Sequence, residues 1–401
     1  MIHNTNKRIA LTGAYAATEA LRQLEIDVVS VYPITPQTPI VESFAKLKSD
    51  GEVQTEIMQV ESEHSALSAC VGASAAGART ATATSSQGLA LMNEILYVAS
   101  GLRLPILMVV SARALSAPLN IHGDHSDVMG ARDAGWIQIF AENPQEVYDN
   151  TLIGMKLAEK ISLPVMSIMD GFNTSHSVEN LEILADETVK KWVGEFTLKN
   201  SLLDPENPVT YGPLVLQNSY FEFKIDQENA MSKALMEYQK IAEDFSRLSG
   251  RKKDCFEEYQ TVDAKEVIVL MGSTAGTAKE VVDNLRSRGQ KVGLLKINLF
   301  RPFPQQAVAE ALKNAKSIAV LDRSQSIGTF PPLYTEVLSS MYNVSSIKNK
   351  NNQSGMIHDT RYMIQSYIYG LGGRDILQAD IEKVFADLKE GKSGNKIKYI
   401  Q

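Results

Sequence analysis

Three residues able to do chemistry each follow a stretch that predicts a β-strand. Thr35 lies in a proline-rich turn, Glu63 opens a run of small residues, and Arg113 follows a wholly apolar stretch. Open α/β sheets bind their ligands at the carboxyl ends of the strands. We therefore expect these three side chains to lie at one edge of one sheet.

If one of the two acidic residues of this run is buried, we expect it to be Glu63 rather than Glu61. The segment Glu61–Ala78 carries small residues at helical spacing, and Glu63 lies three positions before the first of them. Glu61 is rotated away from Glu63 by about 200°, at roughly 100° per residue. A buried carboxylate needs a partner. The pattern alone favours the alternative, in which Ser62 only caps the helix and both glutamates suit the positive end of its dipole. The small residues are Ala66, Ala69, Cys70, Ala73, Ala76 and Gly77.

Arg113 follows the apolar stretch Leu104–Val110, which is typical of a strand buried on both faces. A permanent cation in this position has to meet an anion or water, and an arginine fork suits a small carboxylate. The alternatives are a surface arginine and an ion pair with an acid of the same fold.

Three other groups have both a functional and a structural interpretation. His122, Asp124, His125 and Asp127 could bind a metal, but their spacing matches no zinc signature, and a polar loop lining a pocket is favoured. His64 is either a general base or a solvated residue at a helix start. The turn Gly272–Gly276 either cradles a phosphate or lets a strand pack against a helix.

Helix and strand patterns alternate along the chain, which predicts an α/β fold with mostly parallel sheets. Helices are expected at Ile9–Gln23, Ile40–Lys48, Glu61–Ala78, Leu89–Gly101, Pro144–Ile161, Thr277–Gly289, Pro304–Lys313, Leu333–Tyr342 and Gln378–Glu390. Strands are expected at Ile26–Tyr32, Val53–Val60, Arg79–Ser86, Leu104–Val110, Trp136–Phe140, Leu163–Met169, Glu266–Met271, Lys291–Ile297 and Ser317–Leu321.

A chain of 401 residues exceeds the usual size of one hydrophobic core, so we expect two domains. The first covers residues 1–260, and within it the alternation breaks at about 175–260. We read that stretch as an irregular covering segment, with a polar helix near Glu228–Leu248, part of which should pack on the first domain. The second domain covers residues 261–401.

Composition excludes several classes of protein. The net charge of −7, without long charged blocks, argues against nucleic acid or an anionic membrane as the main partner. The first residues contain no apolar core of signal-peptide length, so we expect a cytoplasmic protein. Cys70 and Cys255 are too few for an iron–sulfur cluster, which needs about four ligands.

Five strings in the sequence closely resemble the α subunit of 2-oxoacid:ferredoxin oxidoreductases, with the pyruvate enzymes nearest. They are YPITPQTP (Tyr32–Pro39), VESEHSA (Val60–Ala66), GASAAGAR (Gly72–Arg79), TATSSQGLALM (Thr82–Met92) and GDHSD (Gly123–Asp127). The similarity extends to about Asp170 and resumes at Lys265–Gly328. It implies a pyrimidine-binding domain of the thiamine-diphosphate-binding fold, followed by a smaller α/β domain like the transketolase C-terminal domain.

The resemblance also implies a role for each of the three candidate residues. Glu63 matches the glutamate that bonds the aminopyrimidine ring nitrogen of thiamine diphosphate and takes part in proton transfer. Thr35 matches a threonine that contacts the bound oxoacid, and Arg113 matches the arginine that receives the carboxylate of that substrate. No metal ligand on this chain is implied.

The same resemblance implies a subunit that is incomplete alone. The family's diphosphate-binding domain carries a Gly-Asp-Gly motif, which does not occur in this sequence. Mg²⁺ and [4Fe–4S] clusters are thus expected on partner subunits of β, γ and δ type. The implied reaction is the reversible conversion of pyruvate and coenzyme A to acetyl-CoA and CO2, with reduction of ferredoxin. This reaction belongs to anaerobic metabolism. The alternatives are a branched substrate such as 2-oxoisovalerate, and a cluster-free, transketolase-like subunit.

Overall fold

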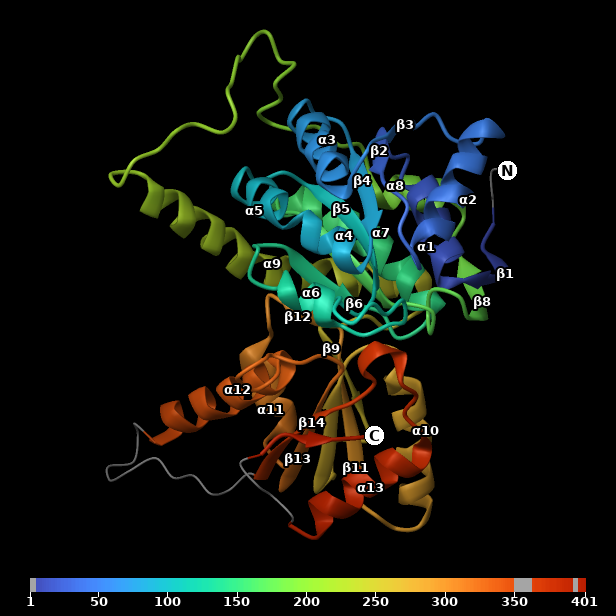
Figure 1. Ribbon diagram of the computed structural model, residues 1–401, viewed down its shortest axis with the longest axis vertical. Helices are drawn as coiled ribbons and strands as arrows, with labels where there is room; N and C mark the ends of the chain where they lie inside the picture. The colour runs from blue at the N-terminus through green and yellow to red at the C-terminus, as the bar shows by residue number, and fades with distance from the viewer. Residues whose placement is uncertain (1–4, 350–362, 392–395) are drawn as a thin grey trace.

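The computed structural model describes residues 5–349, 363–391 and 396–401. Two α/β units lie one above the other, with the amino-terminal unit at the top of Figure 1. Each unit contains a mostly parallel sheet with helices on both faces, so the predicted fold class is confirmed. Within these residues, no helix has both the length and the apolar character needed to cross a bilayer.

The first sheet has seven strands, six of which are parallel to one another. The six are β2 (Val28–Val31), β3 (Glu56–Gln59), β4 (Thr80–Thr84), β5 (Ile106–Ala112), β6 (Ile137–Phe140) and β7 (Val165–Asp170). The order is β12-β6-β7-β5-β4-β2-β3, and the antiparallel edge strand β12 (Leu299–Arg301) comes from much later in the chain. Every residue of β4, β5, β6 and β7 is buried, as in parallel sheets covered on both faces.

Helices cover both faces of this sheet, and each face has its own apolar core. One face packs against α1 (Gly13–Gln23), α2 (Thr38–Ser49), α7 (Pro144–Ile161), α8 (Asp186–Val193) and the carboxyl-terminal half of α9 (Tyr220–Ser249). The other packs against α3 (Glu63–Ala75), α4 (Ser86–Leu91), α5 (Asn93–Gly101) and α6 (Ser126–Gly130).

Helix α7 has the predicted bounds because both of its ends are encoded locally. The Asn143 side chain accepts a hydrogen bond from the Glu146 N–H, and Pro144 occupies the first turn. At the other end Ser162 adopts a left-handed conformation that stops the helix.

The helix predicted at Ile9–Gln23 is wrong over its first four residues. Residues Lys7–Thr12 form strand β1, which pairs antiparallel with β8 (Val178–Ile183), and α1 begins only at Gly13. The Thr12 side chain caps α1 by accepting from the Tyr15 N–H. Local sequence favours a helix here, but a partner strand far along the chain determines the outcome.

The second sheet has six strands, in the order β15-β14-β13-β10-β11-β9. They are β9 (Phe256–Tyr259), β10 (Glu266–Leu270), β11 (Val292–Ile297), β13 (Ser317–Asp322), β14 (Met363–Ile368) and β15 (Lys398–Tyr399), of which only β9 is antiparallel to its neighbour. On one face lie α10 (Thr274–Ser287) and α13 (Gln378–Lys389), and on the other α11 (Gln305–Leu312) and α12 (Pro332–Asn349). A short 3-10 turn, η1 (Leu371–Gly373), follows β14.

The two units share a buried ion cluster. Lys296 on β11 is 2% exposed, and its ammonium lies 2.7 Å from Glu142 and 2.8 Å from Glu146 of the first unit. Glu257 completes the cluster at 3.0 Å. Because a lone buried charge is costly, these carboxylates tie the units together.

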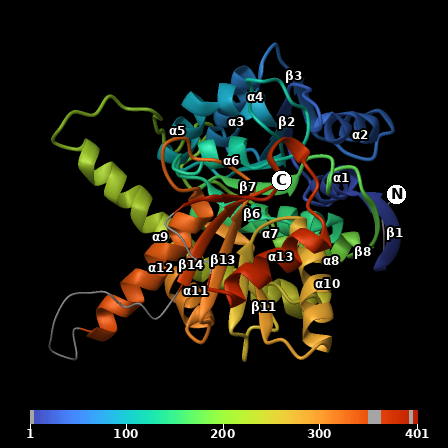
Figure 2. The same ribbon diagram turned by 60° about the horizontal axis from the view of Figure 1, so that its bottom comes forward.

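Part of the segment between the units packs on the first domain, as predicted. From Ala230 onward the buried residues of α9 face the core of the first unit. Residues 202–225, which we call the arm, are the exception: they stand out from the body of the molecule in both views (Figures 1 and 2).

Candidate active site

Glu63 is the first residue of α3 and is buried, whereas Glu61 is exposed. Ser62 caps the helix by accepting from the Ser65 N–H, so both glutamates lie where the helix dipole favours an anion. The two side chains nevertheless differ in burial. Only Glu63 turns inward, as its angle on the helix relative to Glu61 predicted. Its carboxylate has no hydrogen-bond or ion-pair partner among the residues that the structure describes.

The turn after β4 lies directly against Glu63. A Cβ atom added to Gly88 would lie 2.7 Å from Glu63 Oε1 and 2.5 Å from Thr84 Oγ1, closer than atoms tolerate. Only glycine therefore lets α4 approach the carboxylate so closely. The buried hydroxyls of Thr84 and Ser85, at the end of β4, have no hydrogen-bond partner.

Arg113 directly follows β5 and is 6% exposed. Its Nη1 donates to the carbonyl oxygen of Thr35 at 2.7 Å, and its Nε donates to that of Asn120 at 2.9 Å. Burial lowers the pKa of Arg113, and the charge of Asp127 offsets part of that effect. In the described part of the chain no carboxylate pairs with the guanidinium, so neither alternative interpretation of Arg113 holds.

Thr35 thus meets Arg113 through its main chain, while the residue itself is exposed. Gln37, two residues later, is buried and accepts the Ile34 N–H through Oε1. Its Nε2 donor has no partner. The turn therefore adds an unsatisfied donor to the edge of the sheet where Arg113 lies.

Asp127 connects the ends of β4 and β5 at this edge of the sheet through its carboxylate. Its carboxylate accepts the N–H groups of Ser86 at 2.7 Å, Arg113 at 3.0 Å and Val128 at 2.7 Å. Burial raises the pKa of Asp127 to about 7, although the hydrogen bonds from Arg113 and Ser86 act in the opposite direction. Sequence analysis placed Asp127 in a polar loop and in the family string GDHSD, but it did not predict that this carboxylate holds the main chain at the ends of β4 and β5.

The loop that contains His122 and Asp127 belongs to the first unit and makes hydrogen bonds to the second. Asp124 accepts the Gly372 N–H at 3.0 Å, and Asn120 donates to the Gly372 carbonyl at 3.0 Å. His125 lies 2.6 Å from Asp170 Oδ1. Across the described residues, no group of three or more histidine, cysteine or acidic side chains is arranged to hold a metal ion.

Asp170, at the end of β7, binds the turn Gly272–Gly276, which sequence analysis considered as a phosphate site. The main-chain N–H of Ser273 donates to it at 2.9 Å, the Ser273 hydroxyl at 2.6 Å and Arg323 at 2.8 Å. Burial alone raises the pKa of Asp170, but the charges of His125 and Arg323 hold it well below its usual value. The start of α10 therefore receives a carboxylate from the first unit. Nothing local in the sequence signalled this contact.

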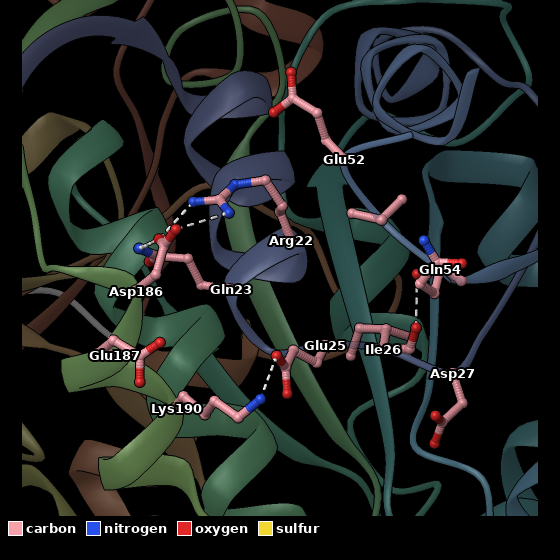
Figure 3. Close-up of a pocket in the computed structure, with 12 residues that line it drawn as sticks. Arg22, Gln23, Glu25, Ile26, Asp27, Glu52, Gln54, Asp186, Glu187 and Lys190 are labelled. Atoms are coloured by element: carbon pink, nitrogen blue, oxygen red, sulfur yellow. Dashed lines mark hydrogen bonds and ion pairs between the residues drawn. The ribbon is translucent and has the colours of Figure 1, made fainter. Parts of the chain in front are cut away.

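A cavity of about 460 Å³ lies at the opposite edge of the first sheet (Figure 3). Residues that precede β2 and β3, such as Asp27 and Thr55, line it, so it faces the amino ends of the strands. Arg22 at its wall is already paired with Glu19 and Asp186. This cavity is separate from the edge where Glu63 and Arg113 lie.

The edge at the carboxyl ends of β2, β4 and β5 can hold a polar ring and an anion. Four buried polar groups there lack a partner among the described residues, and with them lie a carboxylate without a partner and a guanidinium bonded only to carbonyl oxygens. Such groups are satisfied by a ligand with matching donors and acceptors. The four are Gln37 Nε2, Thr84 Oγ1, Ser85 Oγ and Ser111 Oγ.

Two family models match the chain in succession. Residues 19–243 match the thiamine-diphosphate-binding domain of pyruvate flavodoxin/ferredoxin oxidoreductase. Residues 264–381 match core domain II of pyruvate:ferredoxin oxidoreductase. The chain belongs to this oxidoreductase family. The predicted membership is confirmed, and so is the predicted thiamine-diphosphate-binding domain.

Full-length relatives agree with this assignment. Pyruvate synthase subunit PorA of Thermotoga maritima is 52% identical, over 96% of this chain and 95% of the relative. The PorA subunit of Methanocaldococcus jannaschii is 44% identical over 95% of both chains. Ketoisovalerate oxidoreductase subunit VorA of Pyrococcus abyssi is 40% identical, over 95% of this chain and 93% of that one.

A solved structure has the same fold. A chain of the 2-oxoglutarate:ferredoxin oxidoreductase from Magnetococcus marinus matches with a TM-score of 0.67 and 21% identity, over 96% of this chain. The match spans 65% of the length of that larger chain. At this identity the likeness concerns the fold alone.

Proposed function

We propose that this chain is the α-type subunit of a heteromeric pyruvate:ferredoxin oxidoreductase and holds the aminopyrimidine half of the thiamine diphosphate site. The observation that carries the proposal is a buried carboxylate and a buried guanidinium at the carboxyl edge of the first sheet, neither of which has a charged partner within residues 5–349, 363–391 and 396–401. Full-length identity to PorA subunits supports pyruvate as the substrate. The weaker identity to a VorA subunit keeps 2-oxoisovalerate as the second candidate.

Glu63 is the residue that would hold and release a proton at a ring nitrogen of the cofactor. Its burial excludes competing water, and its position at the start of α3 favours the carboxylate form. Bound thiamine diphosphate would supply the nucleophilic carbon and the electron sink for decarboxylation. Gly88 keeps the turn after β4 close enough to fix the Glu63 side chain.

Arg113 would receive the carboxylate of the 2-oxoacid, because in the part of the chain that the structure describes its guanidinium bonds only to neutral carbonyl oxygens. Through the Thr35 carbonyl the same guanidinium fixes the turn after β2. The Thr35 side chain, which is exposed in the isolated chain, would then contact the bound substrate.

The remaining cofactors would lie on other subunits. Burial raises the pKa of both cysteine thiols, Cys70 and Cys255, to about 12, so neither thiolate is readily formed. We therefore assign the [4Fe–4S] clusters, the Mg²⁺ of the diphosphate half and the ferredoxin contact to β-, γ- and δ-type partners. Coenzyme A would accept the acyl group within this assembly, and we expect a cytoplasmic location.

The domain boundary near residue 260 belongs to the same proposal. It separates a pyrimidine-binding domain, residues 1–260, from a domain like the transketolase C-terminal domain, residues 261–401.

The test is to purify the native assembly, identify its subunits and measure ferredoxin reduction with a series of 2-oxoacids. Pyruvate should give the highest kcat/KM, and activity should disappear when thiamine diphosphate is removed and return when it is added. A preference for 2-oxoisovalerate would favour the second candidate. Activity that does not need thiamine diphosphate would refute both.

A further inference from the structure

The arm, residues 202–225, exposes far more apolar surface than a free segment in water should. It begins and ends beside the first unit, and apart from Tyr211, which packs against the core on the α3 face, it extends away from that unit (Figures 1 and 2). Eight of its large apolar side chains are exposed, and Leu214 reaches 92%. The eight are Leu202, Leu203, Leu214, Leu216, Tyr220, Phe221, Phe223 and Ile225.

The helical part of the arm is apolar on more than one side. Helix α9 begins at Tyr220, yet its first buried residue is Ala230. At about 100° per residue, Tyr220, Phe221, Phe223 and Ile225 cover roughly 200° of the helix circumference. A helix end with this pattern fits into a groove that covers both of its sides. A helical end of this length is also marginal in water without such packing.

Both ends of the arm are fixed to the first unit. At one end, Ser201 Oγ donates to the Ala76 carbonyl at 2.8 Å, just beyond the end of α3. At the other, Arg103 Nη1 donates to Asp226 Oδ2 at 2.6 Å, just beyond the end of α5. These contacts make the arm a projection with a defined base on α3 and α5.

The outward surface of the same helices leads from the base of the arm to the candidate active site. Leu91, Tyr97 and Val98 on α4 and α5 are exposed, and Ala69 and Ala73 on α3 are partly exposed. Helix α3 has 13 residues, a length of about 20 Å at 1.5 Å per residue. A protein of ordinary domain size that covers Glu63 therefore also reaches the arm.

We infer that the arm inserts into a groove of the subunit that supplies the diphosphate half of the site. The inference rests on the proposed function, because Glu63 has no partner among the described residues and needs a second chain to complete the pocket. Helix α3 begins at Glu63 and ends beside the base of the arm, so the chain that covers Glu63 lies within reach of the arm, which favours this subunit over a second copy of the same chain. The arm thus holds the two halves of the active site together from the far end of α3.

Photo-crosslinking in the complete purified enzyme identifies the occupant of the arm. With p-benzoylphenylalanine in place of Phe221, ultraviolet light should join this chain to the subunit that carries the Gly-Asp-Gly motif. The same probe at Val262, 86% exposed in the second unit, is the matched control and should give less than a tenth of that product. A crosslink from position 221 to a second copy of this chain, or to another subunit, would overturn the inference.

Binding measurements give an independent test. The double variant Phe221→Ser/Ile225→Ser should weaken binding of the diphosphate-binding subunit at least tenfold, and Val262→Ser should not. Both side chains are exposed, so the melting temperature of the isolated chain should stay within about 2 °C. Unchanged binding by the double variant would overturn the inference.

The proposed function and the inference can fail separately. Glu63→Gln should lower turnover by about 10²–10⁴-fold and leave assembly intact. An active Glu63→Gln enzyme whose arm variant still dissociates would refute the role of Glu63 and retain that of the arm.

Discussion

Replacing Glu63 by glutamine in the assembled enzyme separates its chemical role from its structural one. The substitution keeps the size of the side chain and removes its charge. Because no group among the described residues hydrogen-bonds to the carboxylate, the variant breaks no contact of this chain. What is lost is the helix-dipole interaction at the start of α3, worth about 0.3–1 kcal/mol, and lower desolvation of the side chain offsets part of it. The free energy of unfolding should therefore change by less than about 1 kcal/mol.

The effect on turnover should be far larger. Loss of a positioned proton-transfer group costs about 10²–10⁴ in rate, and at 1.36 kcal/mol per tenfold this is about 3–5 kcal/mol of transition-state stabilisation. The assay is pyruvate-dependent ferredoxin reduction by the complete enzyme, with thermal unfolding measured in parallel. Glu61→Gln is the matched control, because Glu61 is exposed on the preceding turn, and its turnover should stay within twofold. A Glu63→Gln enzyme with more than a tenth of normal turnover would refute the reasoning.

Further predictions concern the groups around Glu63. Arg113→Met should raise the KM for the 2-oxoacid about 100-fold, since loss of a buried charge partner costs about 3 kcal/mol; an unchanged KM in steady-state kinetics would contradict it. Gly88→Ala should lower turnover at least tenfold, because its Cβ would meet Glu63 Oε1 at 2.7 Å, whereas Gly101→Ala, where a Cβ meets open space, should not. Burial raises the pKa of Asp127 from 3.8 to about 7, so between these values the folded chain holds a proton that the unfolded chain lacks. Its stability in urea should therefore fall as pH rises through that window, and Asp127→Asn should flatten the profile; an equal slope in both proteins would refute this.

Sequence reasoning succeeded where the deciding interactions are local. Helix α7 has an asparagine cap and a first-turn proline, so its bounds could be predicted. The angle on the helix selected Glu63 over Glu61 as the residue that turns inward, and the apolar strand before Arg113 drew attention to that cation but left its burial open. Each of these features depends on residues close by in the chain.

It failed where distant segments decide the structure. Strand β1 exists because β8, about 170 residues later, pairs with it. The contact between Asp170 and the start of α10 joins residues 103 positions apart. Helix α9 begins eight residues before the start predicted for a polar helix at Glu228, and none of these eight residues is buried. The roles of Thr35, Glu63 and Arg113 stay predictions from family resemblance.

The edge strand β12 has a consequence for how the polypeptide is made. It is an edge strand of the first sheet, and all other strands of that sheet precede residue 171. It pairs with β6, with Leu299 opposite Ile139. During synthesis, the first sheet can therefore be completed only after residue 301 has left the ribosome. Until then β6 presents an open hydrogen-bonding edge to other nascent chains. A fragment that ends near residue 260 would lack β12 and leave the edge of β6 uncovered. The first unit is therefore best expressed together with the second.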